Sequence, residues 1–179
     1  RAFSYVKENH KEAKLLILGT GSNKEYLNNL CKRYKLEDSV VFIGFTDNVG
    51  FFLKHSKVFV MASKVEGFPN SMVEAMACGV PIVIADCPGE SAGIIGKIGL
   101  YDCKSELQYC KYGILAPAIS GRAKIDSGLL KEEILLGEAL SNVLDNKEVY
   151  ETYKRRSIER ASKYNIDMVM ALWDKVVMK

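Results

Sequence analysis

Two short apolar segments near the middle of the chain enclose an interval long enough for one helix. Residues 58–62, Val-Phe-Val-Met-Ala, and residues 81–85, Pro-Ile-Val-Ile-Ala, are rich in residues that favour β-structure. Short apolar runs of this kind are typical of strands buried on both faces of a parallel sheet. A strand, a helix and a second strand in this order predict an α/β domain with a mainly parallel sheet.

The residues of the interval mark where its helix begins and ends. Gly67 and Pro69 prevent the helix from extending back toward the first strand. Asn70 or Ser71 can cap its N-terminus, and Gly79 stands where a left-handed residue would end it. The helix start therefore lies at the carboxyl end of the first strand, which is the edge of an open parallel sheet where ligands bind.

Two carboxylates bracket this helix start. Glu66 lies in the preceding loop, and Glu74 lies in the first turn or so of the helix. Backbone N–H groups between Phe68 and Met72, apart from Pro69, which has none, lack helical acceptors, and together with the helix dipole they favour a bound pyrophosphate. Carboxylates accept hydrogen bonds from sugar hydroxyls, and Gly67 allows a ligand to approach closely. The arrangement suits a ligand made of sugar, pyrophosphate and ribose.

Each of these residues also has a purely structural interpretation. Residues 71–74, Ser-Met-Val-Glu, have the form of a capping box, in which Glu74 would only accept a hydrogen bond from the Ser71 backbone. Glu66 alone is typical of a solvated loop, and Phe68 could belong to the core. Taken singly the residues leave these alternatives open, whereas the complete string favours a ligand site.

The complete string, EGFPNSMVEAMACGVP from Glu66 to Pro81, resembles the donor-binding motif of the retaining glycosyltransferases called glycosyltransferase family 4. That motif is a Glu, seven residues, a second Glu and then Ala-Met-Ala-x-Gly-x-Pro. The resemblance implies that Glu66 is the catalytic residue beside the transferred sugar and that Glu74 binds the ribose. It also implies that the intervening segment holds the phosphates through Gly67, Phe68, Pro69, Asn70 and Ser71.

The resemblance extends along nearly the whole chain. Residues 14–21 are similar to the family's second strand and glycine turn, and residues 40–45 to its third strand, which ends near the nucleotide base. Gly19, Gly44 and Phe45 are thereby implied to be donor-binding residues. Residues 86–89 and 112–117 are similar to later parts of the domain. The implied fold is a Rossmann-like three-layer α/β sandwich, the C-terminal half of a GT-B fold, ending in helices.

The chain departs from the family pattern in two respects. Family members have a further first strand that ends in Gly-Arg-Leu and is followed by a Lys, and these two cations lie on the donor phosphates. This chain begins inside the helix that follows, where Arg1 is expected to lie. We also expect the amino-terminal, acceptor-binding domain of the family to lie outside these residues. We therefore expect residues 1–179 to form a single nucleotide-sugar-binding domain, a fragment that is inactive alone.

Composition agrees with one globular domain. Of 179 residues, 48% are hydrophobic and 26% are charged, which is enough for one sizeable core. The apolar runs of the sequence are shorter than the roughly 18 residues of a membrane-spanning helix. The five cysteines form no Cys-x-x-Cys pair, which is typical of reduced intracellular protein. We expect a cytoplasmic protein, with the inner face of the membrane as a site of peripheral contact.

The charge pattern argues against one class of partner. A net charge of +3 does not favour a nucleic-acid surface. The one basic cluster, at residues 154–163, is interleaved with acidic residues and is typical of a solvated helix face. Contact with an anionic membrane or a lipid-linked acceptor is the alternative for this cluster.

Elsewhere the pattern is mostly helical. Apolar spacing predicts helices at residues 25–35, 48–55, 130–144, 147–162 and 167–177. We expect Trp173 to pack the last helix onto the body. Residues 89–112 lack a clear period and are expected to form a loop with a short insertion near the ligand edge.

Other ligand motifs fail on inspection. Lys24 stands where a dinucleotide fingerprint that starts at Gly19 would need its third glycine, and the P-loop pattern is absent. His10 and His55 have no paired ligands in the sequence, so a zinc site is not expected. We expect no metal and no cofactor. Asp86 follows a strand and is expected in a loop, with contact to the donor sugar as the alternative.

Two functional hypotheses of different class remain. The first, favoured by the intact pair of Glu residues, is the donor-binding half of a retaining, hexosyltransferase-type enzyme. It would move a sugar from a nucleotide diphosphate sugar, with UDP favoured over GDP, to a glycan or lipid-linked acceptor in bacterial surface polysaccharide synthesis. The second is a noncatalytic nucleotide-sugar-binding module on the same fold. A nucleotide-sugar epimerase fits the motif spacing less well.

Overall fold

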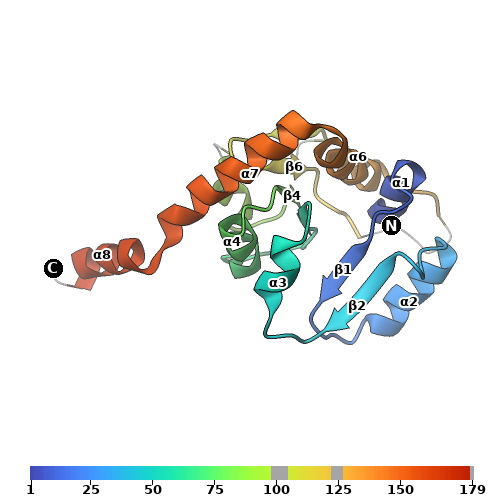
Figure 1. Cartoon of the computed structure of the whole chain (residues 1–179), viewed down its shortest axis with the longest axis horizontal. Coiled ribbons are helices and arrows are strands. Elements are labelled where there is room, and N and C mark those ends of the chain that lie inside the picture. The colour runs from blue at the N-terminus through green and yellow to red at the C-terminus, as the bar shows by residue number, and fades with distance from the viewer. Residues whose placement is uncertain (98–104, 122–126, 178–179) are drawn as a thin grey trace.

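Within the residues that the structure describes, the strands form two groups that are not hydrogen-bonded to each other. The computed structural model describes residues 1–97, 105–121 and 127–177 (Figure 1). In this part of the chain β1 (Leu15–Leu18) pairs with β2 (Val40–Gly44), and a second sheet has the order β3-β4-β6-β5. The second sheet consists of β3 (Phe59–Met61), β4 (Ile82–Ala85), β6 (Ile114–Ala116) and β5 (Gln108–Tyr109). All pairs are parallel except β5 with β6.

Helices cover both faces of the second sheet, because its central strand is apolar throughout. All four residues of β4 are buried, and successive side chains of a strand point to opposite faces. Ile82 and Ile84 belong to one core cluster, with residues of α4 (Asn70–Ala77) and α5 (Ser91–Ile94). Val83 belongs to another, with residues of α1 (Ala2–Asn9) and α6 (Lys131–Asp145). The result is the three-layer arrangement that the sequence predicts.

The remaining helices connect these elements or follow them along the chain. α3 (Val49–Lys54) joins β2 to β3, and α7 (Lys147–Ala161) packs against α4. α2 (Lys24–Arg33) follows β1, and its Cys31 packs with Leu36 and Val40 in a third, smaller cluster. After the short helix η1 (Ser162–Tyr164), α8 (Ile166–Val177) is the last element among the described residues.

The segment at 89–112 is more ordered than the sequence predicts. It contains α5, in which Ser91 and Ile94 are buried, and β5, whose Gln108 lies opposite Leu115 of β6. The expectation of a loop with a short insertion is therefore wrong for the residues of α5 and β5. A two-residue strand has no period of its own and is fixed by its pairing with β6, which a local pattern cannot reveal. Residues 98–104 of this segment lie outside the described residues.

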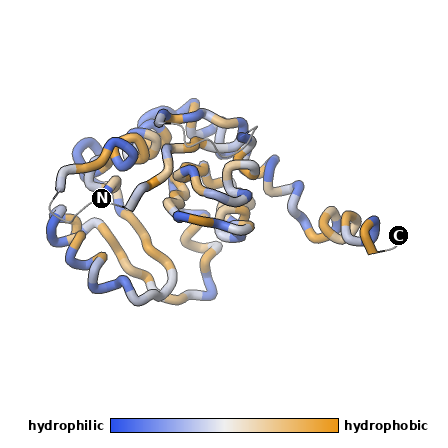
Figure 2. The backbone as a smooth tube through the Cα atoms, turned by 180° about the vertical axis from the view of Figure 1, so that it is seen from behind, coloured by the Kyte–Doolittle hydropathy of each residue, from blue (hydrophilic) through white to orange (hydrophobic). Residues whose placement is uncertain are grey.

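The expected packing of Trp173 is also wrong. Trp173 is 59% exposed, and α8 has no buried residue. The helix leaves the body after η1 and projects away from it, with the C-terminus at its far end (Figures 1 and 2). The sequence gives the helical period correctly, but within the described residues nothing covers the apolar face of this helix.

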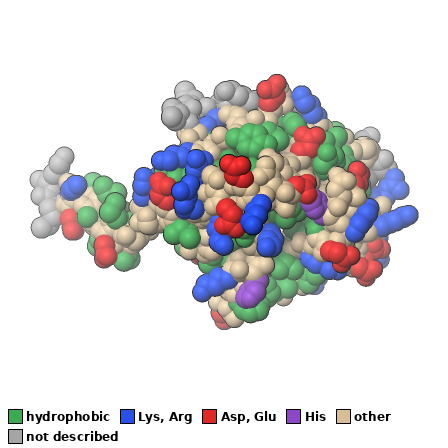
Figure 3. Space-filling model, turned by 45° about the horizontal axis from the view of Figure 1, so that its top comes forward, with side chains coloured by type: hydrophobic (Ala, Val, Ile, Leu, Met, Phe, Trp, Pro, Cys, Tyr) green, Lys and Arg blue, Asp and Glu red, His purple; other side chains and the backbone are tan. Residues whose placement is uncertain are grey.

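None of the helices in the described ranges is both long enough and apolar enough to span a bilayer. The basic cluster of α7 lies where this helix leads into α8, and Lys and Arg side chains gather there on the surface (Figure 3). Two of its members contact the body: Arg156 donates to the Lys111 carbonyl at 3.2 Å, and Arg160 donates to the Ile94 carbonyl at 2.7 Å. Part of the cluster therefore anchors α7 to its neighbours.

Candidate functional site

The start of α4 presents uncapped backbone amides, as its sequence predicts, but its cap differs from the expected one. Pro69, with φ −78°, is the N-cap residue, and no side chain caps the helix. Its carbonyl accepts the backbone N–H groups of Met72 and Val73 at 3.1 and 3.3 Å. Among the described residues, no backbone acceptor is recorded for the N–H groups of Asn70 and Ser71. These amides are available to an anion.

Neither Asn70 nor Ser71 acts as a cap, and the capping box is not formed. Asn70 is already the first helical residue, so its side chain lies one position too far along to bind the first-turn amides. Glu74 is exposed, and no hydrogen bond from it to Ser71 is recorded among the described residues. The carboxylate of Glu74 therefore does not cap the helix. The structural interpretation of this residue is wrong.

The loop that carries Glu66 is fastened to the loop that follows β4. Glu66 donates its backbone N–H to the Pro88 carbonyl at 3.1 Å, and Glu90 donates to the Gly67 carbonyl at 3.2 Å. Gly89, with φ +122°, lies between these bonds, and a Cβ there would come within 1.6 Å of the Glu66 carbonyl oxygen. The two loops therefore meet through backbone alone. This contact fixes where the half-buried Glu66 stands relative to α4.

Phe68 lies on the surface of this loop and not in the core. It is 48% exposed, and its ring meets that of Tyr164 edge to face with centroids 5.4 Å apart. The Arg160 guanidinium lies 5.0 Å from the centre of the Tyr164 ring. Gly67, by contrast, has no atom within 4 Å of the position a Cβ would take. Before the helix start, Phe68 therefore packs against Tyr164, whereas the space beside Gly67 is free of other protein atoms.

A buried ion pair lies directly after β4 and was not found from the sequence. Asp86 is 2% exposed, and its Oδ2 accepts a hydrogen bond from Lys97 Nζ at 2.8 Å. The backbone N–H of Asp86 donates to the Ala116 carbonyl, while its Oδ1 has no hydrogen-bond partner. A buried carboxylate needs a partner. The only signal in the sequence was a lone Asp at a strand end, too weak to indicate a pair with Lys97.

The glycines predicted at the ends of β1 and β2 meet each other. Gly19 donates its backbone N–H to the Gly44 carbonyl at 2.7 Å, and the following Phe45 is 77% exposed. No hydrogen bond between these residues and the Glu66–Glu74 segment is recorded in the described part of the chain. The predicted donor-binding residues thus follow strands of both groups: Gly19, Gly44 and Phe45 lie at the ends of β1 and β2, and residues 67–74 follow β3.

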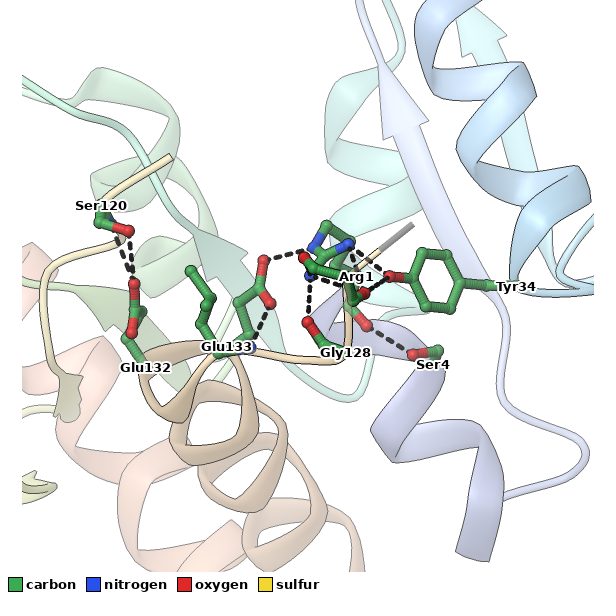
Figure 4. Close-up of polar contacts among 9 residues, drawn as sticks. Arg1, Ser4, Tyr34, Ser120, Gly128, Glu132 and Glu133 are labelled. Carbon is green, nitrogen blue, oxygen red and sulfur yellow. Dashed lines mark hydrogen bonds and ion pairs between the residues drawn. The ribbon is translucent and has the colours of Figure 1, made fainter. Parts of the chain in front are cut away.

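Arg1 is engaged at the start of α1, as expected for a residue on the helix, and does not replace a phosphate-binding cation. Its Nε donates to Glu133 Oε1 at 2.7 Å, and its Nη2 donates to the Gly128 carbonyl at 2.7 Å. Figure 4 shows its side chain between Glu133 and Tyr34, to whose hydroxyl it also donates. The hydrogen bond to Glu133 raises the pKa of Arg1 above its usual value. The guanidinium links α1 to α6.

Within the ranges that the structure describes, no three His, Cys, Asp or Glu residues gather in a group able to hold a metal ion. The expectation that donor binding needs no metal stays a prediction.

Comparison with known proteins identifies the family. The family model described as glycosyl transferases group 1 matches residues 1–97, which is more than half of the chain. The chain belongs to this family. The matched part of this family member includes Glu66, Glu74 and both loops that meet at Gly89.

Two relatives illustrate how far the similarity reaches. An uncharacterized glycosyltransferase of Methanocaldococcus jannaschii is 31% identical over 99% of this chain and 45% of its own length. An N-acetylgalactosaminyltransferase of Campylobacter jejuni that acts on N-acetylgalactosamine-N,N'-diacetylbacillosaminyl-diphospho-undecaprenol is 36% identical over 48% of this chain and 23% of its own length. The chain thus spans less than half the length of each of these two relatives.

Solved structures share the fold. TarM of S. aureus, in complex with fondaparinux, α-GlcNAc-glycerol and UDP, matches with a TM-score of 0.75 and 22% identity over 96% of this chain and 30% of its own. The α/β fold with a mainly parallel sheet and C-terminal helices is that of GT-B glycosyltransferases, and the predicted fold class is confirmed.

Proposed function

We propose that residues 1–179 are the donor-binding half of a retaining glycosyltransferase of glycosyltransferase family 4. The observation that carries the proposal is the open start of α4, which lies between two carboxylates for which no side-chain hydrogen bond is found among the described residues. Glu74 is exposed on the helix, and Glu66 stands in a loop that its backbone fastens to the residues after β4. This is the arrangement a ligand of sugar, diphosphate and ribose requires.

The chemistry follows from where charge develops. The leaving group of the reaction is a nucleoside diphosphate, so negative charge grows on its phosphate oxygens as the anomeric bond breaks. Amides at the start of α4, with the positive end of the helix dipole, stabilise that charge without rearrangement. Glu74 accepts hydrogen bonds from the ribose hydroxyls, and Glu66 lies beside the sugar. Gly67 leaves room for the phosphates to approach the backbone.

The relatives support a choice of donor and acceptor. UDP is bound in the TarM structure, and the C. jejuni relative is named for an acceptor that carries diphospho-undecaprenol. We favour a UDP-hexose or UDP-N-acetylhexosamine over a GDP-sugar as donor and a glycan or lipid-linked acceptor in surface polysaccharide synthesis. The acceptor would be held by a facing domain outside this chain, at the cytoplasmic face of a membrane.

A thermal-shift screen tests the proposal. The chain is heated with UDP-, GDP-, ADP- and dTDP-linked sugars, because a ligand that binds only the native state raises its melting temperature. At a ligand concentration of about 100 Kd the stabilisation is ~2.7 kcal/mol, or roughly 5–10 °C for a domain of this size. We expect the largest rise with a UDP-sugar and the same rise with EDTA present. A failure of every nucleotide sugar to raise the melting temperature would contradict the proposal.

A further inference from the structure

The donor loop, residues 66–69, carries the backbone that leads into α4. Hydrogen bonds fasten its first half to the loop after β4, through the N–H of Glu66 and the carbonyl of Gly67. Its last residue, Pro69, is buried and is the N-cap of the helix. For the N–H of Phe68, between these two ends, no acceptor is recorded in the described part of the chain. Contacts of the Phe68 side chain therefore help to fix the direction of this amide.

The Phe68 ring contacts Tyr164 of η1, a residue far along the chain. The two rings meet edge to face, at 71° and with centroids 5.4 Å apart, which is a geometry that aromatic pairs prefer. Tyr164 is partly buried and packs against the core cluster that contains Met72 and Met76 of α4. The exposed ring of Phe68 thus lies against a ring that the core holds in place.

Arg160 holds Tyr164 from the side of α7. Its guanidinium lies 5.0 Å from the centre of the Tyr164 ring and 5.2 Å from the centre of the Tyr112 ring. Its Nε and Nη2 donate to the carbonyls of Ile94 and Gly93 at 2.7 and 3.2 Å, and hydrogen bonds from charged donors are the stronger ones. These carbonyls belong to α5, which directly follows the loop after β4. The aromatic contact and the backbone bonds of the donor loop therefore have a common support.

A contact of this kind is large enough to affect binding. An edge-to-face pair shifts an equilibrium between two conformations by about two- to tenfold beyond the effect of the buried area. The apparent affinity for a ligand falls in proportion to the fraction of the protein that has the binding conformation. Phe68 is 48% exposed, so without the Tyr164 ring its side chain would be free to change rotamer. Nucleotide affinity would then fall by a factor in the same range.

We propose that Tyr164 is a positioning residue of the donor site, which acts through Phe68 and holds the donor loop where a diphosphate meets the start of α4. The inference rests on the proposed function and adds a residue to its site. Tyr164 lies outside residues 1–97, the part of the chain that matches the family model.

A double-mutant cycle on UDP affinity, measured by calorimetry, tests the proposal. Tyr164→Leu and Phe68→Leu should each weaken UDP binding by about three- to tenfold. The double variant should bind no more weakly than either single variant, because both remove the same contact. Tyr164→Phe keeps the ring and should bind UDP as the unaltered chain does. The matched control is Tyr150→Leu, a partly buried tyrosine of α7 that packs against the other core cluster, and it should also bind normally.

The outcomes separate a positioning role from a structural one. A lower melting temperature of Tyr164→Leu with unchanged UDP affinity would overturn the proposal, because Tyr164 would then only stabilise the fold. Losses of affinity that add in the double variant would overturn it as well, since Tyr164 would not act through Phe68. Failure of Tyr164→Phe to keep the affinity would do the same, because the hydroxyl and not the ring would be required.

Backbone order parameters from NMR, recorded without ligand, distinguish failure of this proposal from failure of the proposed function. Those of Gly67 and Phe68 should fall from the range of rigid backbone, about 0.85, toward the flexible range below about 0.6 in Tyr164→Leu. They should stay unchanged in Tyr164→Phe and Tyr150→Leu. A donor loop as rigid in Tyr164→Leu as in the unaltered chain would overturn the proposal, whether or not the chain binds UDP.

Discussion

Gly89 is the residue at which the site tolerates least change. Its φ of +122° is rarely adopted by other residues, and an added Cβ would overlap the Glu66 carbonyl oxygen. We predict that Gly89→Ala lowers the free energy of unfolding by on the order of 2 kcal/mol and separates the two loops. Chemical denaturation measures the first effect, and nucleotide affinity the second. Gly50→Ala, where no atom lies within 4 Å of an added Cβ, is the control. Equal stability of the two variants would contradict the account.

The buried pair of Asp86 and Lys97 gives a second prediction at this scale. Asp86→Ala would remove the buried carboxylate that lies 2.8 Å from Lys97 Nζ, and breaking a buried ion pair by removing one partner costs about 3–5 kcal/mol. We predict that the double variant Asp86→Leu with Lys97→Met recovers most of the loss, because two apolar side chains of similar volume need no partner. Urea unfolding of the single and double variants checks this. A double variant no more stable than Asp86→Ala would show that the charges contribute little to one another.

Sequence analysis correctly placed Glu66 in the loop, Glu74 on α4 and an open helix start between them, because each position follows from residue type and local spacing. Their roles in donor binding stay predictions. Sequence analysis did not find the Asp86–Lys97 pair or the contact at Gly89. These depend on the meeting of segments that are separate along the chain, and the loop after β4 meets Glu66 only because β3 and β4 are neighbours. It also assigned the helix cap to Asn70 or Ser71, one or two residues beyond the observed Pro69.

At the scale of elements, α8 is expected to contribute little to the stability of the folded domain. It has no buried residue, and its recorded neighbour is η1. We predict that a chain ending at Asn165 unfolds within about 0.5 kcal/mol of the complete chain, as for changes away from packed features. Chemical denaturation of both chains measures this. A loss of several kcal/mol would mean that the apolar face of α8, with Trp173, packs against the body in solution.

The longer elements were predicted well, as were the short elements β3, β4 and α3, whereas β5 and α5 were not. Helices α6 and α7 each have 15 residues, so their apolar period is unambiguous, and their observed bounds differ from the predicted ones by about one residue. The strand β5 and the helix α5 have two and four residues and are fixed by their neighbours. For α8 the apolar spacing correctly predicted a helix, but such spacing does not show whether another element packs against its apolar face.

At the scale of the whole molecule, we predict that residues 1–179 bind donor without transferring sugar. Transfer requires an acceptor positioned at the anomeric carbon and exclusion of water, and both need a facing surface. Arg1 is held by Glu133 and Gly128 and cannot assist the leaving group. Product detection with a panel of nucleotide sugars and acceptors compares the chain with a polypeptide that includes the facing domain. Robust transfer by the chain alone would refute this expectation.

The central claim is that the start of α4 and Glu74 bind a nucleotide, and calorimetric titration of UDP into the chain tests it most directly. Glu74→Ala removes an exposed carboxylate that caps nothing, so its melting temperature should be unchanged. Its affinity for UDP should fall by about 1–3 kcal/mol, the value of a charge-assisted hydrogen bond. Glu151→Ala, an exposed carboxylate on α7, should bind as the unaltered chain does. If Glu74→Ala bound UDP with unchanged affinity, Glu74 would not be part of a nucleotide site.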